Sequence, residues 1–333
     1  MRSDSSIIPI ALGANWIYAL PSREGLLLVD AGPDYPGVWE ELSAQLDVHG
    51  YRPEGVRGVV VTHAHVDHCG LAARWQSLGA EVWGSAEEVE GFGLGLAIGW
   101  RNAEFVLRFY AEYGVPVNVV ERMRERWKPL PPSAISARVN KRWPGLLSGT
   151  PFRPDRLLRD GEEVRVGERR LRFVATPGHT PGDSVYYEEA GGSLFSGDHL
   201  LPRITPTTGI HFPTNRYEER MRSLPAYSRS LERVRALGAR HLYPGHGEET
   251  ADIEGVAERT AAHHRRRQGQ IRDLLRDGPL TPYEILRKIY PHLPEGRLRQ
   301  GMAEIVGQID ALVEAGMAVE VREAEESLRI GLS

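Results

Sequence analysis

The chain has 333 residues, of which 41% are hydrophobic, and a formal net charge of −4. This length allows one large domain or two ordinary ones, and the mild charge argues against a general nucleic-acid binder. The one cysteine, Cys69, excludes an internal disulfide and is typical of a reducing compartment. Residues 1–6 lack the apolar core of a signal peptide, and the apolar stretch Phe92–Trp100 is too short to span a bilayer. We therefore expect a cytoplasmic protein without a membrane partner.

Short apolar segments at the start of the chain predict strands at residues 7–8, 14–20 and 25–30. The third of these ends in Asp30-Ala31-Gly32, which places a carboxylate at the end of a buried strand. Asp30 is therefore either a support for a nearby ligand histidine or a turn residue. Residues 34–49, with apolar residues at helical spacing, predict a surface helix.

The densest group of metal-binding side chains follows the next predicted strand, at residues 56–62. His63, His65, Asp67 and His68 lie within six positions. His63 and His65 are two apart, so an extended backbone points them to one side, whereas the adjacent Asp67 and His68 suit a second metal. Neutral imidazole and carboxylate oxygen suit zinc, iron or manganese. A helix to about residue 78 follows, so the cluster is predicted in a strand-to-helix loop, where chemistry is often found.

After a predicted strand at residues 81–84, an insertion at about residues 85–150 interrupts the alternation of strands and helices. It is helical in character, and between Trp100 and Leu147 it has nine Lys and Arg against four Asp and Glu. One interpretation is a cap over the site that favours an anionic substrate. The other is a packed structural excursion with a solvated basic face.

Three later motifs place glycine beside polar residues at the ends of predicted strands. His179 follows a strand at residues 170–175, Asp198 follows one at 193–196, and His246 follows one at 240–243. Further strands are predicted at residues 163–166 and 184–187, and a helix at 216–237. Because glycine permits close backbone approach, these motifs and the first cluster fit one site at one edge of a sheet.

In this order and spacing, Thr-His-Ala-His-Val-Asp-His, Pro-Gly-His-Thr, Ser-Gly-Asp and Pro-Gly-His-Gly resemble the motifs of the metallo-β-lactamase-fold hydrolases. The resemblance covers about residues 7–250 apart from the insertion. It implies an α/β fold, a four-layer αββα sandwich with a dinuclear metal site at one edge. The implied ligands are His63, His65 and His179 for the first metal, Asp67, His68 and His246 for the second, and Asp198 as the bridge. Asp30 matches a support position in the same family.

The resemblance is strongest to the glyoxalase II-like branch, because Asp198 stands where zinc β-lactamases often have a cysteine. The nuclease branch inserts a domain after the bridging aspartate, and the roughly 48 positions between Asp198 and His246 leave no room for it. The implied cofactors are two divalent ions, most simply Zn²⁺, with iron or manganese as alternatives. A hydroxide shared by two such ions is expected to attack the substrate, with Asp67 passing on its proton.

Residues 251–333 predict a C-terminal domain beside a catalytic domain at 1–250. Helices are expected at residues 252–277, from 281, and at 297–315, followed by a hairpin of residues 319–322 and 327–330. This winged-helix-like unit resembles the tail of the β-lactamase-like protein 2 subgroup, some of whose members are ribonucleases. From Thr281 onward there are six Lys and Arg against nine Asp and Glu, which favours packing or homodimer formation over nucleic-acid binding.

Four other histidines are candidates for contacts at the mouth of the site: His199, His211, His263 and His264. The alternative for each is an ordinary loop or helix-surface histidine. The expected function is that of a metal-dependent hydrolase whose substrate is a small thioester or ester, which could be anionic. The alternatives are an endoribonuclease with the same metals, a persulfide dioxygenase-like enzyme with one iron, and a non-catalytic regulatory module.

Overall fold

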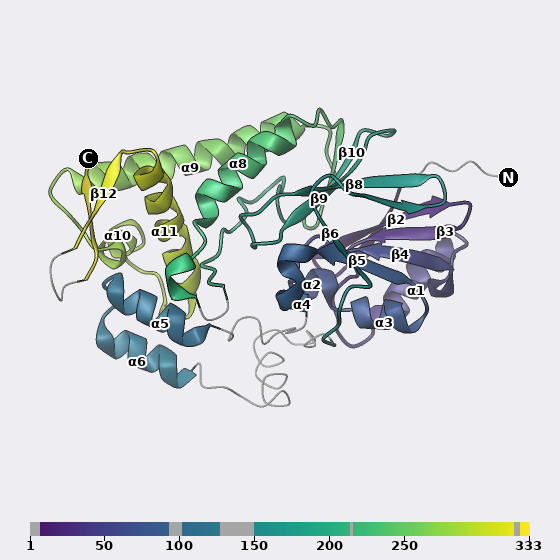
Figure 1. Ribbon diagram of the computed structural model, residues 1–333, viewed down its shortest axis with the longest axis horizontal. Helices are drawn as coiled ribbons and strands as arrows, with labels where there is room; N and C mark the ends of the chain where they lie inside the picture. Colours follow the sequence, from purple (N-terminus) through teal and green to yellow (C-terminus); the bar gives the residue numbers. More distant parts are fainter. Residues whose placement is uncertain (1–6, 93–101, 127–149, 214–215, 323–326) are drawn as a thin grey trace.

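Two β-sheets lie face to face with helices on the outer side of each, and a separate group of helices lies at one end (Figure 1). This computed structural model describes residues 7–92, 102–126, 150–213, 216–322 and 327–333. Within these ranges, no helix is long and apolar enough to cross a membrane. The apolar stretch Phe92–Trp100 lies, after its first residue, outside the described residues.

The first sheet has six strands, which follow one another in chain order. They are β1 (Ile8–Leu12), β2 (Asn15–Ser22), β3 (Gly25–Val29), β4 (Val56–Val60), β5 (Glu81–Ser85) and β6 (Arg156–Leu158). The first three strands pair antiparallel, and β3 to β6 pair parallel. The sequence does not predict β6, because its first two residues are exposed and supply no apolar pattern.

Alternation along β2 separates two hydrophobic cores. Ile17 and Ala19 face the outer core, which the helices α1 (Val38–Val48) and α3 (Ala72–Ser77) cover. Tyr18 and Leu20 face the core between the two sheets. This is the period-two pattern of a strand that is buried on both faces.

The second sheet has five strands, in the order β11-β10-β9-β8-β7. They are β7 (Glu163–Val166), β8 (Arg169–Ala175), β9 (Ser184–Glu188), β10 (Ser193–Gly197) and β11 (His241–Pro244). Its outer face is covered by α8 (Ser223–Arg235) and the first half of α9 (Ile253–Leu275). Helices, sheet, sheet and helices thus form four layers, which confirms the predicted αββα sandwich.

The group of helices at the C-terminal end has its own core. It is built from the second half of α9 and from α10 (Pro282–Ile289), α11 (Leu298–Glu314) and the hairpin β12 (Ala318–Val321) and β13 (Arg329–Leu332). Two helices of the insertion, α5 (Ala103–Glu112) and α6 (Val117–Arg126), complete this core and lie beside α10 (Figure 1). These two helices of the insertion therefore pack in the C-terminal unit, whereas Phe92, at the end of the short helix α4 (Val89–Phe92), packs in the outer core of the first sheet. Residues 93–101 and 127–149 of the insertion, and with them the rest of the predicted cap, lie outside the described residues.

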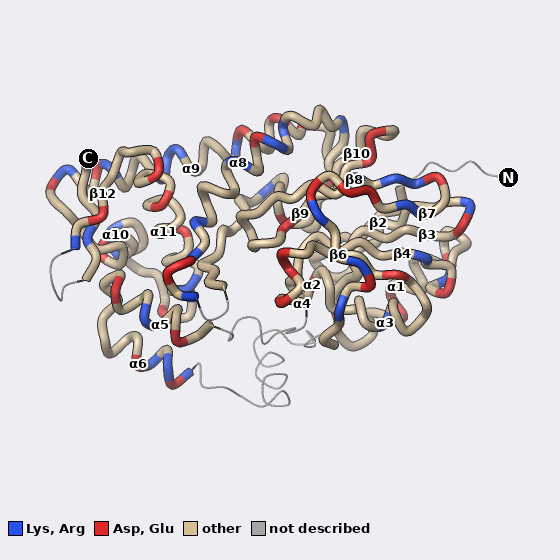
Figure 2. The backbone as a smooth tube through the Cα atoms, in the orientation of Figure 1, with Lys and Arg blue, Asp and Glu red and all other residues tan. Residues whose placement is uncertain are grey.

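Local signals explain where the C-terminal helices begin. Thr281 accepts a hydrogen bond from the backbone of Glu284, whose side chain accepts one from the Thr281 backbone, and Pro282 occupies the first turn. A buried ion pair ties this unit to the segment before α8, because Arg220 donates two hydrogen bonds of 2.7 and 2.8 Å to Asp310 on α11. Figure 2 shows both basic and acidic residues along the C-terminal helices.

Candidate metal centre

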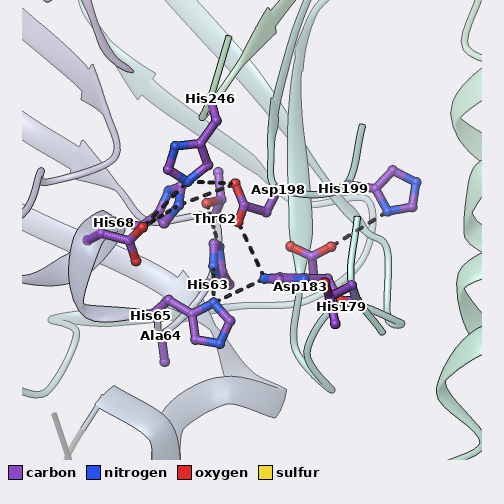
Figure 3. A network of polar contacts seen from close by, with 12 residues as sticks. Thr62, His63, Ala64, His65, His68, His179, Asp183, Asp198, His199 and His246 are labelled. Carbon is purple, nitrogen blue, oxygen red and sulfur yellow. Dashed lines mark hydrogen bonds and ion pairs between the residues drawn. The ribbon is translucent and has the colours of Figure 1, made fainter. Parts of the chain in front are cut away.

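The ends of several strands meet at one edge of the two sheets, which is where the predicted ligands lie. β8 and β10 both pair antiparallel with β9, so they run in the same direction, and β11 pairs parallel with β10. His179, Asp198 and His246 follow the carboxyl ends of these three strands. His63 follows the end of β4, and the next ligand candidates lie before and within the short helix α2 (Val66–Cys69). Figure 3 shows the side chains converging from both sheets.

The first donor cluster consists of His63, His65, His179 and Asp198. Nδ1 of His65 lies 2.9 Å from Nε2 of His63 and 3.0 Å from Nε2 of His179. Oδ2 of Asp198 lies 3.6 Å from Nε2 of His179. Three imidazole nitrogens and one carboxylate oxygen therefore surround one point, as a bound metal requires.

The second donor cluster consists of Asp67, His68 and His246. Nε2 of His246 lies 3.4 Å from Oδ2 of Asp67, and Nε2 of His68 lies 3.8 Å from the same oxygen. Oδ1 of Asp198 lies 3.4 Å from both of these imidazole nitrogens. One oxygen of Asp198 thus faces each cluster, which is the arrangement expected of a bridging ligand.

Asp30 fixes the proton of His68 from behind the cluster. Its carboxylate accepts hydrogen bonds from Nδ1 of His68 at 2.8 Å, the backbone N–H of Thr62 at 2.8 Å and the Thr62 hydroxyl at 3.0 Å. Because that hydroxyl donates to Asp30, its oxygen is left to accept from Nδ1 of His63, 3.1 Å away. In their neutral forms, both imidazoles therefore carry their proton on Nδ1 and turn the lone pair of Nε2 toward the clusters.

Backbone carbonyls hold two more ligand candidates in the same way. Nδ1 of His179 donates to the carbonyl oxygen of Thr207, and Nδ1 of His246 donates to that of Ala14, each at 2.8 Å. The lone pairs on Nε2 of both rings again face inward. A histidine that is held by its outer nitrogen is typical of metal sites in proteins.

The donor atoms fit a pair of divalent metal ions. Nε2 of His68 and Oδ1 of Asp198 are buried, and no residue in the described part of the chain makes a hydrogen bond to them. Buried polar atoms normally have partners, so these two require one. Burial and the neighbouring imidazoles hold the pKa of His63 well below its usual value, and they lower that of His65 to about 3, so both rings are neutral. Neutral imidazole is the form that binds a metal.

The two carboxylates of the clusters are ionised. Burial raises the pKa of Asp67 and Asp198, but His68 and other imidazoles outweigh burial and hold both pKa values well below the usual range. Burial also disfavours the charged form of His68, yet Asp198, Asp67 and Asp30 raise its pKa well above the ordinary value. These carboxylates create a negative potential at Nε2 of His68, and the same potential attracts a divalent cation.

Glycine at one strand end permits the close approach that the sequence predicts. A Cβ atom on Gly245 would lie 2.6 Å from Cε1 of His68 and 3.1 Å from Oδ1 of Asp198. Any larger residue would therefore push into the second cluster. Gly197 has a φ of +49°, and its Cβ would meet the Thr62 hydroxyl at 2.5 Å.

Two supporting residues were missed by the sequence analysis. Nδ2 of Asn15, the first residue of β2, donates to Oδ2 of Asp67 at 3.1 Å. The buried carboxylate of Glu88 accepts from the backbone N–H of Gly182 at 2.7 Å and of Ala64 at 3.3 Å. Glu88 therefore joins the two loops that hold His63, His65 and His179. Neither residue belongs to a ligand motif, so no pattern in the sequence indicated them.

Two of the other candidate histidines lie behind the clusters. His199 is fully buried, with Nδ1 3.6 Å from Oδ2 of Asp183 and its ring against Tyr227. Figure 3 shows it on the far side of Asp183 from the donor clusters. Nε2 of His211 lies 3.1 Å from the backbone oxygen of His179. His211 therefore contacts the backbone of a ligand candidate, whereas His199 contacts Asp183 and Tyr227.

The remaining two candidates, His263 and His264, lie on α9. Nε2 of His263 is 3.7 Å from Oε1 of Glu304, and His264 is 9% exposed and contacts Gln308. They lie outside both donor clusters and line a cavity against the C-terminal helices.

Comparison with known proteins identifies the family. Residues 11–246 match the sequence profile of the metallo-β-lactamase superfamily. The chain belongs to this superfamily. It is 26% identical over 310 residues to the probable metallo-hydrolase YqjP of Bacillus subtilis (strain 168), and the match covers 91% of this chain and 89% of that protein.

Two more similarities bear on fold and activity. A metallo-β-lactamase family protein from Thermus thermophilus has 29% sequence identity and a TM-score of 0.72, with 98% of each chain covered. The hydroxyacylglutathione hydrolase of Methylococcus capsulatus (strain ATCC 33009 / NCIMB 11132 / Bath) is 32% identical over 161 residues, which cover 44% of this chain and 57% of that protein. This metallo-β-lactamase superfamily chain is thus a metallo-hydrolase by family, with a His and Asp centre suited to divalent metals.

Proposed function

We propose that the chain is a dizinc hydrolase of small thioesters or esters. The observation that supports this most is the position of Asp198, which turns one carboxylate oxygen toward each donor cluster. When bound, a pair of divalent cations supplies Lewis acidity and lowers the pKa of water. The seven donors are imidazoles and carboxylates without a thiolate, a set that suits zinc and also accepts iron or manganese.

Asp67 is the residue proposed to handle the proton. Its side chain is 33% exposed, more than those of His68, His179, Asp198 and His246. Asn15 holds Oδ2 from the side, and the neighbouring imidazoles keep the carboxylate ionised. An ionised carboxylate at the open side of the centre is placed to orient a water molecule and to accept its proton as an acyl carbon is attacked.

The proposed thioester class rests on two supports. The relative from Methylococcus capsulatus is named as a hydroxyacylglutathione hydrolase, and hydroxyacylglutathiones are thioesters. An aspartate, Asp198, also stands at the bridging position, as in the glyoxalase II-like enzymes. The mixed charges of α10 and α11 do not favour the nuclease alternative, which requires a basic path to the metals (Figure 2).

A substrate panel tests the proposal. Zinc-loaded protein is given S-lactoylglutathione, p-nitrophenyl acetate, a lactone and an oligoribonucleotide, and kcat/KM is measured for each. We expect the highest value for the thioester, and a 10²- to 10⁴-fold loss of kcat, to order of magnitude, in Asp67→Asn. Zinc content is measured in parallel, because Asp67 also belongs to the second cluster. Asp277→Asn, an exposed aspartate far from the centre along the chain, is the matched control and should behave as wild type. Cleavage of the oligoribonucleotide without acyl hydrolysis would refute the proposal, as would oxygen consumption with a persulfide.

A further inference from the structure

We propose that a cavity beside the metal centre binds the anionic end of a small molecule that also has an apolar part. The cavity has a volume of about 410 Å³ and lies between the loop of residues 204–208, helices α9 and α11, and the segment that follows α10. Thr207 lines it, and the carbonyl of the same residue holds His179 of the first cluster. A ligand in the cavity would therefore contact the segment that orients a metal-ligand histidine. Its volume falls in the range of small-molecule sites.

One residue that lines the cavity, His264, has a buried hydrogen-bond donor that lacks an acceptor. Nε2 of Gln268 donates to Oε1 of Gln308 at 3.2 Å, which leaves the Gln308 amide nitrogen to donate to Nδ1 of His264 at 2.8 Å. Nδ1 of His264 is therefore an acceptor, and the ring proton must sit on Nε2. That nitrogen is buried, and it has no hydrogen-bond partner in the part of the chain that the structure describes. A carboxylate or carbonyl oxygen is the partner that such an N–H group lacks.

The ring of His264 keeps this neutral, donating form over the ordinary pH range. Burial is the main cause that lowers its pKa to about 4, and the neighbouring His263 adds to it, while Glu304 opposes it. The aromatic ring of Tyr227 on α8 packs near the imidazole of His264, at a centroid distance of 5.9 Å. The donor is therefore fixed in place by α8, α9 and α11 together.

Unpaired charge at the cavity is positive. Glu304 is the acidic residue among the described lining residues, and its carboxylate accepts from Nε of Arg267 at 2.8 Å and from the Tyr290 hydroxyl at 2.7 Å. Arg297 also lines the cavity, and the described residues supply no ion-pair partner for its guanidinium. An unpaired guanidinium next to a neutralised carboxylate favours an anion.

The other lining residues and a neighbouring cavity indicate where the apolar part of the ligand would lie. Ile204, Pro206 and Leu293 supply an apolar surface. A neighbouring cavity of about 340 Å³ shares Ile204, Thr205 and His263 with the first and adds Arg266. We assign the first cavity to the carboxylate-bearing end of the hydrolysed substrate, an assignment that rests on the proposed function. A separate anionic effector has the same chemistry, and the experiment distinguishes the two sources.

The experiment compares two thioesters that differ only in charge. S-glutaryl-N-acetylcysteamine ends in a carboxylate, and its methyl ester does not. In Arg297→Gln we expect KM for the carboxylate to rise about tenfold at unchanged kcat, with no change for the methyl ester. Arg297 is exposed, so the substitution leaves the core intact. Arg272→Gln, an exposed arginine of α9 outside the cavity, is the matched control.

A binding measurement separates failure of the cavity from failure of the proposed function. Glutarate is titrated calorimetrically into zinc-loaded wild type, Arg297→Gln, His264→Gln and Arg272→Gln proteins. Weaker glutarate binding in the first two variants, with or without thioester hydrolysis, supports the anion site. If hydrolysis occurs and KM does not discriminate while glutarate binding does, the ligand is a separate effector. Equal KM values and equal glutarate binding across all four proteins would overturn the proposal.

Discussion

Replacement of Asp30 tests how the protein holds its metal centre. The buried carboxylate accepts three hydrogen bonds of 2.8 to 3.0 Å, two from Thr62 and one from His68. The backbone of Asp30 also has a φ of 65°, which aspartate tolerates better than alanine does. Asp30→Ala leaves three donors unpaired, each at a cost of about 1–3 kcal/mol, and adds backbone strain of about 1 kcal/mol. We expect the free energy of unfolding to fall by at least about 3 kcal/mol.

The assay is urea unfolding in the presence of a chelator, so that bound metal does not contribute. Asp47→Ala, an exposed aspartate on α1, is the control and should change the free energy of unfolding by less than about 0.5 kcal/mol. In the same Asp30 variant, His68 loses the acceptor that fixes its proton, so the affinity of the second metal should fall about 10- to 100-fold. An Asp30→Ala protein within about 1 kcal/mol of wild type that binds two metals equally well would refute this reasoning.

Three further predictions follow from single contacts. Asn15→Ala should lower the affinity of the second metal about tenfold and spare the first, which a chelator-competition titration measures; equal losses at both sites would contradict the contact with Asp67. Arg220→Ala should lower the free energy of unfolding by about 3 kcal/mol, because it leaves the buried carboxylate of Asp310 without its partner. Arg229→Ala breaks an exposed ion pair and should lower it by less than about 1 kcal/mol. His264→Gln should reduce acid sensitivity. The pKa of His264 is about 4 in the folded state, so the unfolded chain takes up the proton first as pH falls below about 6.5. Wild type should therefore lose up to about 1.4 kcal/mol of unfolding free energy per pH unit relative to the variant. Parallel curves of stability against pH from pH 7 to pH 4 would contradict this.

Individual strands and helices followed from local patterns in the sequence, whereas the four-layer arrangement was implied by the family resemblance. Strands such as β3 and β4 are short apolar runs that end at polar motifs, and the structure begins and ends them within about two residues of the expected positions. The helix expected from residue 281 likewise begins there, as α10 with Thr281 as its N-cap. The strand β6 was missed because its exposed arginine and leucine, Arg156 and Leu157, supply no alternation.

The candidate ligands were recognisable because each is a metal-binding residue type in a motif at a strand end. The residues that hold them were not, apart from Asp30. Asn15 and Glu88 are polar residues without a motif, and only the folded chain brings them to Asp67 and to the backbone of Gly182. The carbonyl oxygens that hold two of the histidines carry no sequence signal at all, since every residue has one.

Long-range packing explains the remaining differences. The helices α5 and α6 were expected within the catalytic domain, as part of the insertion. Their apolar faces instead join the core of α9, α10 and α11, which lie more than 100 residues later in the sequence. The sequence of an amphipathic helix shows that one face is buried, but it does not show which element covers that face.

Metal content per chain tests the central claim most directly. Wild type, His63→Ala and His246→Ala are purified without added metal, and zinc, iron and manganese are measured against protein concentration. The account predicts about two divalent metals per wild-type chain and about one in each variant, since each variant damages one of the two clusters. Wild-type protein that retains no metal and binds none on titration would contradict the account.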